Sequence, residues 1–287
     1  MSKKLGDRKD ATLIRKIDSM HFIMAQIYPN RCDNEAYVME RIDLTNLNEY
    51  LAKKNADDPE YKYNFFQCIV TALLKTITLR PKLNRFIANG NFYQRNVVSA
   101  SFVVKKIFSD NGSEGTAFIT GETTDTINDI HNKIYKAVST TRGGSNSTED
   151  TMDIFNKIPK FISKAAIRFV MWLDKHGWVP QSFISDDPFY SSVVLSNVGS
   201  IKLKSGYHHL TNWGTTSLFV MVGEKKIRPY YEADGSFVMH DSIDLGVTID
   251  ERIADGYYYS KSIRLIKKLL ENPELLEKEL SEDVGEF

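Results

Sequence analysis

Residues 63–79 read YNFFQCIVTALLKTITL and are apolar on nearly every side, which predicts a buried helix. Pro81 follows directly and ends this helix, because proline lacks the amide hydrogen that a helix interior needs. A helix that is apolar all round requires packing partners on several sides. The chain has 287 residues, of which 42% are hydrophobic and 26% charged, so it can supply them. No interdomain linker is visible, and we expect one domain over 1–287, with residues 1–12 flexible.

The surrounding segments alternate between strand and helix patterns. Residues 35–43 alternate as a strand does, and a helix is expected from Thr45 to Asn55. The other expected elements are strands within 91–108, a helix over about 124–138, a loop over 140–150, strands near 191–197, 215–222, 226–231 and 236–249, and a helix from Tyr257. This order predicts a mixed α/β protein.

The overall charge balance favours no particular class of partner. Lysine plus arginine and aspartate plus glutamate both number 37, so no overall charge favours nucleic acid or an anionic membrane. Cys32 and Cys68 lie far apart and lack a metal-like spacing, which is typical of a reducing compartment and predicts a cytoplasmic protein. The first ten residues, MSKKLGDRKD, precede no apolar stretch and predict neither a signal peptide nor a membrane anchor.

A basic stripe occupies the segment from Met152 to Leu173. Four cations recur there at helical spacing: Lys157, Lys160, Lys164 and Arg168. Pro159 interrupts the segment, so it is not a membrane span. Three interpretations remain open: a solvated face on a helix packed over the sheet, a helix on a membrane surface, or a phosphate-binding stripe. Gly177 is expected to end this helix.

General catalytic signatures are missing from the sequence. It has no P-loop, no dinucleotide-binding glycine fingerprint and no His-Glu-x-x-His pattern. His208 and His209 are candidate bases, but adjacent strand residues point to opposite faces and do not easily share a metal. We expect one of them to lie in the core or at a subunit contact and the other to be exposed, and no metal site.

Two motifs about fifty residues apart carry a family resemblance. LSNVGS at 195–200 ends a strand, and TIDERIADG at 248–256 precedes a helix that ends in ENPELL. This order resembles the catalytic domain of the dihydrolipoyl acyltransferases of 2-oxo acid dehydrogenase complexes and its relative chloramphenicol acetyltransferase. The resemblance is strong from Ser192 to Leu276, weaker from Ala36 to Ala88, and lost between about 110 and 190.

The resemblance implies an architecture and a partner. It predicts an α/β two-layer sandwich of the chloramphenicol acetyltransferase type, in which helices cover one side of a mixed sheet. It also implies a homotrimer with active sites between subunits, coenzyme A as the acyl carrier and a small thiol or hydroxyl compound as acceptor. The basic stripe is then a candidate for the coenzyme A phosphates. The sequence contains neither a lipoyl domain nor a subunit-binding domain.

The motifs assign roles residue by residue. Ser196 corresponds to the hydroxyl that stabilises the tetrahedral oxyanion, although a strand-end serine can also simply bond its own turn. Asp255, followed by Gly256, corresponds to a structural aspartate that pairs with an arginine, for which Arg15 is the candidate. Asp255 is equally suited to cap the helix that follows.

Glu251 stands where the family has its catalytic histidine. A carboxylate is about two pK units less basic than an imidazole, and its negative charge opposes an oxyanion forming beside it. The sequence therefore leaves two functions open. The first is a CoA-dependent acyltransferase that uses Glu251, His208 or His209 as base. The second is an inactive homologue that serves as a trimeric ligand-binding or assembly subunit.

Overall fold

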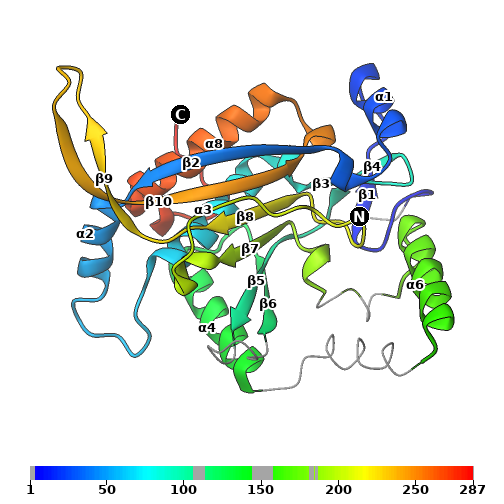
Figure 1. The fold of residues 1–287 in the computed structure, drawn as a ribbon, viewed down its shortest axis with the longest axis horizontal. Helices are drawn as coiled ribbons and strands as arrows, with labels where there is room; N and C mark the ends of the chain where they lie inside the picture. Colours follow the sequence, from blue (N-terminus) through cyan, green and yellow to red (C-terminus); the bar gives the residue numbers. More distant parts are fainter. Residues whose placement is uncertain (1–3, 106–113, 144–157, 181–183, 185–186, 287) are drawn as a thin grey trace.

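The computed structural model describes residues 4–105, 114–143, 158–180, 184 and 187–286 (Figure 1). The strands are β1 (Ala11–Leu13), β2 (Glu35–Asp43), β3 (Arg85–Ala88), β4 (Asn91–Arg95), β5 (Val98–Lys105), β6 (Glu114–Gly121), β7 (Val193–Asn197), β8 (Leu218–Val222), β9 (Lys226–Tyr231) and β10 (Phe237–Asp250). The α-helices are α1 (Ser19–Ile27), α2 (Thr45–Lys54), α3 (Phe65–Leu79), α4 (Ile127–Gly143), α6 (Lys160–Lys175) and α8 (Gly256–Glu271). Short 3-10 helices include Glu251–Ile253, after β10, and Pro273–Glu277.

A mixed sheet forms the centre of the protein. Its strand order is β2-β10-β8-β7-β5-β6, and β9 extends β10 as a projecting hairpin (Figure 1). Strand β7 runs parallel to both β5 and β8, whereas the other pairs in this sheet are antiparallel. The predicted mixed sheet is confirmed.

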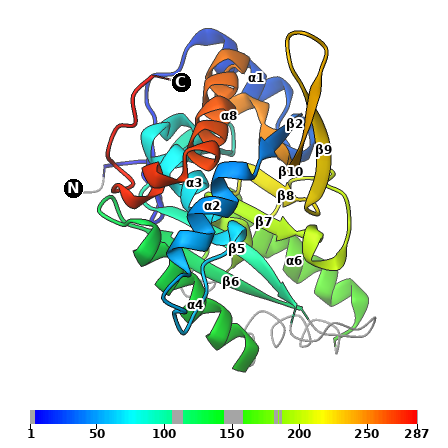
Figure 2. The ribbon, with the colours of Figure 1, turned by 90° about the vertical axis from the view of Figure 1, so that its left-hand side faces the viewer.

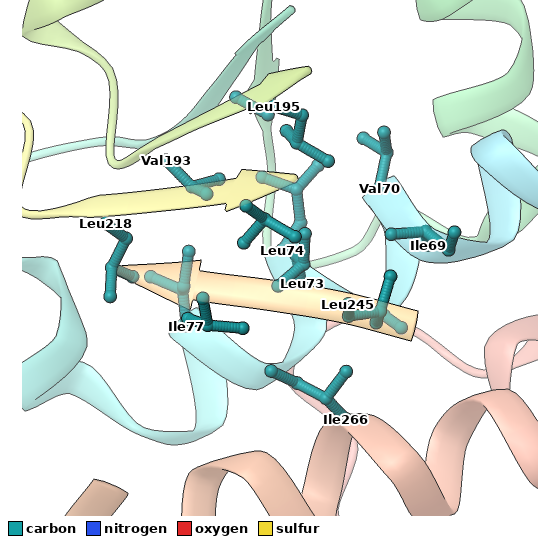
Figure 3. Close-up of a cluster of buried hydrophobic side chains, with 14 of the residues drawn as sticks. Ile69, Val70, Leu73, Leu74, Ile77, Val193, Leu195, Leu218, Leu245 and Ile266 are labelled. Carbon is teal, nitrogen blue, oxygen red and sulfur yellow. The ribbon is translucent and has the colours of Figure 1, made fainter. Parts of the chain in front are cut away.

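Helix α3 is the buried helix that the sequence predicts. It begins at a capping box in which Asn64 and Gln67 satisfy each other's backbone amides, and Pro81 follows its end. Figure 3 shows leucine and isoleucine side chains of α3 facing those of β7, β8 and β10, with Ile266 of α8 close by. Helices α2, α4 and α8 pack beside α3, so one face of the sheet carries the helical layer (Figure 2).

The opposite face of the sheet is partly covered by a non-helical segment, residues 203–214. The Ser205 hydroxyl donates to the carbonyl of Met221 at 2.9 Å, and Leu210 packs on Val194 and Phe219. This close approach requires Gly246 in β10, because a Cβ at that position would clash with the Gly206 carbonyl oxygen.

The N-terminal segment contacts the rest of the fold through a strand and a buried arginine. Strand β1 pairs with β4 in a second, three-stranded sheet of order β1-β4-β3. The Arg8 side chain is buried and donates to the Asp174 carbonyl at 2.7 Å. Residues 8–12, expected to be flexible, thus make long-range contacts with the rest of the fold, and residues 1–3 lie outside the described part.

Helix α4 is also longer than predicted, since it continues to Gly143. The expected loop over 140–150 was therefore wrong for residues 140–143, which are helical, and residues 144–150 lie outside the described part. Gly177 has φ of +69°, the left-handed conformation expected of a residue that ends a helix. Across the described ranges, no helix is both long and apolar enough to cross a membrane.

Replacing Gly246 with Ala is expected to destabilise the fold by about 1–3 kcal/mol, because the new methyl group must displace segment 203–214 or bend β10. Urea denaturation of the variant measures the free energy of unfolding. Gly143→Ala is the matched control, since a Cβ there meets no atom of the described residues within 4 Å. Equal stability of the two variants would contradict the close crossing.

Candidate functional site

Ser196 lies at the C-terminal end of β7 and lines a pocket of about 580 Å³. Its side chain is half-buried, and Asn197 follows it on the same pocket wall. The other walls come from the N-terminal end of α3, the end of β5, and α4. Ser196 is thus one of the residues that a ligand in this pocket would meet.

The pocket combines aromatic walls with a few polar groups. The rings of Tyr61 and Tyr135 stack with centroids 3.3 Å apart, and both side chains line the pocket. Asn197 Oδ1 is buried and accepts no hydrogen bond from the described residues, so it is available to a ligand donor. Lys105 and Arg142 also line the pocket and bring positive charge to it.

Glu251 begins the short 3-10 helix at the end of β10. Its backbone N–H donates to the Asn34 carbonyl at 2.9 Å, while its side chain is exposed. Any desolvation of this carboxylate must therefore come from a second molecule or a substrate rather than from its own subunit.

The two charges that flank Glu251 form a buried ion pair. Arg252 donates through Nε and Nη2 to the two oxygens of Asp250 at 2.8 and 2.7 Å, and both side chains are buried. Arg31 Nε lies 3.8 Å from Asp250, and burial lowers the pKa of Arg31. Arg252 also donates to the Tyr28 carbonyl at 2.8 Å, which ties the end of α1 to the loop.

Asp255 is the N-cap of α8. Its carboxylate accepts the Tyr258 N–H at 2.8 Å, and this hydrogen bond lowers the pKa of Asp255. Gly256 is the first residue of the helix. Arg15 does not reach this site: it donates to the Leu5 carbonyl at 2.8 Å and lies 3.9 Å from Asp7. The expected Arg15–Asp255 pair was wrong for the single chain, because the N-terminal segment folds back on Arg15.

His208 and His209 lie at the same end of the sheet as Glu251. The His208 ring stacks on Phe219 with centroids 4.2 Å apart, and Phe219 pairs with Thr248 of β10. His208 is half-buried and His209 is exposed. The next residue, Leu210, donates its N–H to the Glu35 carboxylate. Glu35 in β2 is the strand partner of Asp250 in β10.

A third histidine, His21 on α1, was missed by the sequence analysis. Its Nδ1 lies 2.9 and 2.8 Å from the two oxygens of Asp18, and hydrogen bonding to His21 lowers the pKa of Asp18 to about 2. Helix α1 packs against the 3-10 helix that Glu251 begins. The three-residue spacing of Asp18 and His21 can be read from the sequence. Only the tertiary structure places these two residues beside the loop that carries Glu251.

Ser196 and Glu251 do not meet within one subunit. Ser196 pairs with Met221, and Met221 pairs with Gly246, whereas Glu251 lies beyond the far end of β10. At about 3.3 Å per strand residue, this places Glu251 roughly 16 Å further along the sheet. A site that uses both residues needs a second copy of the chain.

The predicted basic stripe is on α6 and not at the pocket. Lys160, Lys164 and Arg168 are exposed on this helix, and Lys157 lies outside the described residues. The described residues that line the pocket around Ser196 include none of these three cations. Nor do the described side chains include a group of three or more His, Cys, Asp or Glu residues arranged to hold a metal ion.

Asp250→Asn is expected to destabilise the protein by about 3–5 kcal/mol, because it leaves the Arg252 and Arg31 guanidinium groups buried without a counter-charge. Thermal or urea unfolding tests this. Asp244→Asn is the control: Asp244 also pairs with two arginines, Arg41 and Arg228, but at a more exposed position. A small loss for Asp250→Asn would contradict the role of the buried pair.

Part of this chain matches a known protein family. Residues 185–277 match the family model for the 2-oxoacid dehydrogenases acyltransferase catalytic domain. No curated protein sequence gives a match.

Three solved structures share the fold. A dihydrolipoamide acetyltransferase of Azotobacter vinelandii, investigated for the catalytic role of a serine, a histidine and an asparagine, is 12% identical, with a TM-score of 0.60 over 92% of this chain and 94% of that one. The cubic core of a pyruvate dehydrogenase multienzyme complex is 10% identical, with a TM-score of 0.59 over 92% and 94%. A chloramphenicol acetyltransferase is 13% identical, with a TM-score of 0.59 over 91% and 99%.

The match includes both sequence motifs, since Ser196 and Glu251 fall within residues 185–277. The fold extends over nine-tenths of the chain. Together these findings confirm the resemblance to the catalytic domain of the 2-oxoacid dehydrogenase acyltransferases, with the chloramphenicol acetyltransferase-like fold.

Proposed function

We propose that this protein is a CoA-dependent acyltransferase whose active site forms between two copies of the chain. The family match supports acyl transfer at the level of the family. The observation that carries the intersubunit site is the position of Ser196 in a pocket at one end of the sheet and of Glu251 at the other.

Each copy would then contribute a different half of the site. One subunit supplies Ser196, Asn197 and the pocket, and its neighbour supplies the Glu251 loop. The homotrimer expected from the family resemblance provides such contacts. Its support here is the apolar surface left exposed on one chain, which includes Ile227, Tyr231 and Phe237 of the β9–β10 hairpin.

The chemistry follows from these positions. A base removes the proton from the thiol or hydroxyl of a small acceptor, whose sulfur or oxygen attacks the thioester carbonyl carbon. The Ser196 hydroxyl donates a hydrogen bond to the oxyanion of the tetrahedral intermediate. Collapse of the intermediate breaks the carbon–sulfur bond, and the CoA thiolate recovers the proton from the base.

Positive charge at the pocket favours the anionic carrier. Coenzyme A bears phosphates, and Lys105 and Arg142 line the same pocket as Ser196. A cation near the mouth of the pocket attracts these phosphates while the acyl end approaches Ser196. Asn197 Oδ1, which lacks a protein donor among the described residues, accepts a hydrogen bond from an amide of the carrier or from the acceptor.

The base is the part of the site that departs from the family. Glu251 holds the position of the family histidine, and contact with a neighbouring subunit would desolvate its exposed carboxylate and make it more basic. His208 and His209 lie at the same end of the sheet. The alternative function, an inactive trimer that only binds the acyl carrier, requires that none of these side chains accepts the proton.

Glu251→Gln is expected to lower turnover about a hundredfold or more, because it keeps the shape of the side chain but removes its basicity. The assay measures CoA release from a panel of short acyl-CoA species with a simple thiol acceptor. Glu49→Gln, at an exposed position on α2, is the matched control. If Glu251 is the base, Glu251→His is expected to leave turnover unchanged or to lower it. A rise in turnover would instead indicate a disabled acyltransferase whose pocket still accommodates an imidazole.

Other outcomes reassign the base or reject catalysis. A rate that titrates near the ordinary imidazole value of about 6.5, and that is lost on replacing His208 or His209 with Gln, assigns the proton transfer to that histidine. If the wild type and the Glu251→His variant release no CoA from any donor but still bind acyl-CoA, the binding function replaces the acyltransferase.

A mixing experiment tests the intersubunit site. Ser196→Ala and Glu251→Gln are each expected to be inactive alone. Trimers refolded from an equal mixture recover about a quarter of the wild-type sites, because some interfaces combine an intact Ser196 with an intact Glu251. No recovery in mixed trimers would contradict an active site shared between subunits. A chain that sediments as a stable monomer and has full activity would contradict it as well.

A further inference from the structure

Helix α6 exposes an unusual amount of apolar surface. Phe161, Phe169 and Trp172 are 76%, 58% and 46% exposed, and Trp178, just after the helix, is 59% exposed. Only Asp174 of this helix is buried. The helix lies at the margin of the molecule and not over the sheet (Figure 1). The expected packing of this segment over the sheet was therefore wrong.

The helix is attached at its C-terminal end. The Tyr190 hydroxyl donates to Asp174 Oδ1 at 2.6 Å, and Arg8 donates to the Asp174 carbonyl at 2.7 Å. Leu173 packs on a small cluster formed by Val179, Ile184 and Tyr190. These contacts hold the last turn firmly and leave the aromatic side chains of the preceding turns exposed.

Three of the four exposed aromatic rings, Phe169, Trp172 and Trp178, lie against one another. Trp172 stacks on Phe169 with centroids 6.1 Å apart and meets Trp178 edge-on at 5.3 Å. His176 lies between the two tryptophans, 4.6 Å from Trp172 and 5.0 Å from Trp178. We call Phe161, Phe169, Trp172 and Trp178 the aromatic patch.

Positive charge borders this patch on one side. At about 100° per residue, Lys160, Lys164 and Arg168 fall on one stripe of the helix, next to the stripe of Phe161, Trp172 and Phe169. The acidic side chain of α6, Asp174, is buried against Arg8, so every exposed charge on this helix is positive. The chain as a whole has a formal net charge of zero, so this charge is a local feature.

We propose that α6 and Trp178 form a peripheral binding surface for an anionic lipid bilayer. The aromatic patch would enter the headgroup region, where tryptophan and phenylalanine side chains are stable. The lysine and arginine stripe would contact the phosphates of acidic lipids while the aliphatic stems lie along the apolar boundary. The helix precedes residues 185–277, the stretch that matches the acyltransferase family, so this surface is additional to the predicted catalytic motifs.

Vesicle binding tests the proposal. The full-length protein is mixed with phosphatidylcholine vesicles, with or without about one-third phosphatidylserine, and separated by flotation. We expect binding to the anionic vesicles, weakened by salt, together with a blue shift of tryptophan fluorescence. Two of the three tryptophans lie at this surface.

Three variants separate the contributions. The double variant Lys164→Glu with Arg168→Glu is expected to weaken binding at least about tenfold. Phe169→Ser with Trp172→Ser should abolish flotation with the anionic vesicles. The matched control, Lys53→Glu with Lys136→Glu, makes the same change in net charge at exposed positions on α2 and α4 and should bind as the wild type does.

Each remaining outcome overturns the proposal. Absence of wild-type flotation with anionic vesicles excludes a lipid surface. Equal loss of binding in the control shows general electrostatic attraction instead of a built surface. A wild-type oligomer that dissociates when Phe169 and Trp172 are replaced assigns the patch to a second copy of the chain. Weaker CoA binding by the Lys164 and Arg168 variant assigns the stripe to the acyl carrier.

Discussion

The register of β10 determines where every part of the candidate site lies. This strand pairs with β2 along one edge and with β8 along the other, and Ile243, Leu245, Val247 and Ile249 point into the helical layer. A slip of one residue would turn this apolar set to the opposite face, so burial fixes the pairing strongly. The register in turn places the Glu251 loop at one end of the sheet and Ser196 toward the other.

The three adjacent charges at the end of β10 have different environments and therefore different roles. Asp250 and Arg252 are buried and bonded to each other, and Arg252 also holds the end of α1. Glu251, between them, is exposed. A rigid buried pair thus presents one carboxylate at the surface of the subunit. In the proposed intersubunit site, a neighbour would supply the desolvation that a carboxylate base needs.

The fold is retained at 10–13% identity to its solved relatives, because a core requires apolar volume at the right positions and not particular residues. The helical layer around α3 shows this principle. Outside the matched stretch the chain has features of its own, and α6 is the clearest: its C-terminal turn is fixed by Asp174, and its aromatic patch is exposed.

The sequence by itself determined the elements whose signal is local. The all-round apolar pattern of α3, the alternation of β2 and the positions of the strands along the C-terminal third were predicted, and the motifs around Ser196 and Asp255 identified the fold. Asp255 caps its helix as a local rule requires. Only the tertiary structure decided that Arg15 bonds elsewhere and that Asp18 and His21 lie beside the loop. These features depend on contacts between residues distant in the sequence, which helical and strand periodicity do not encode.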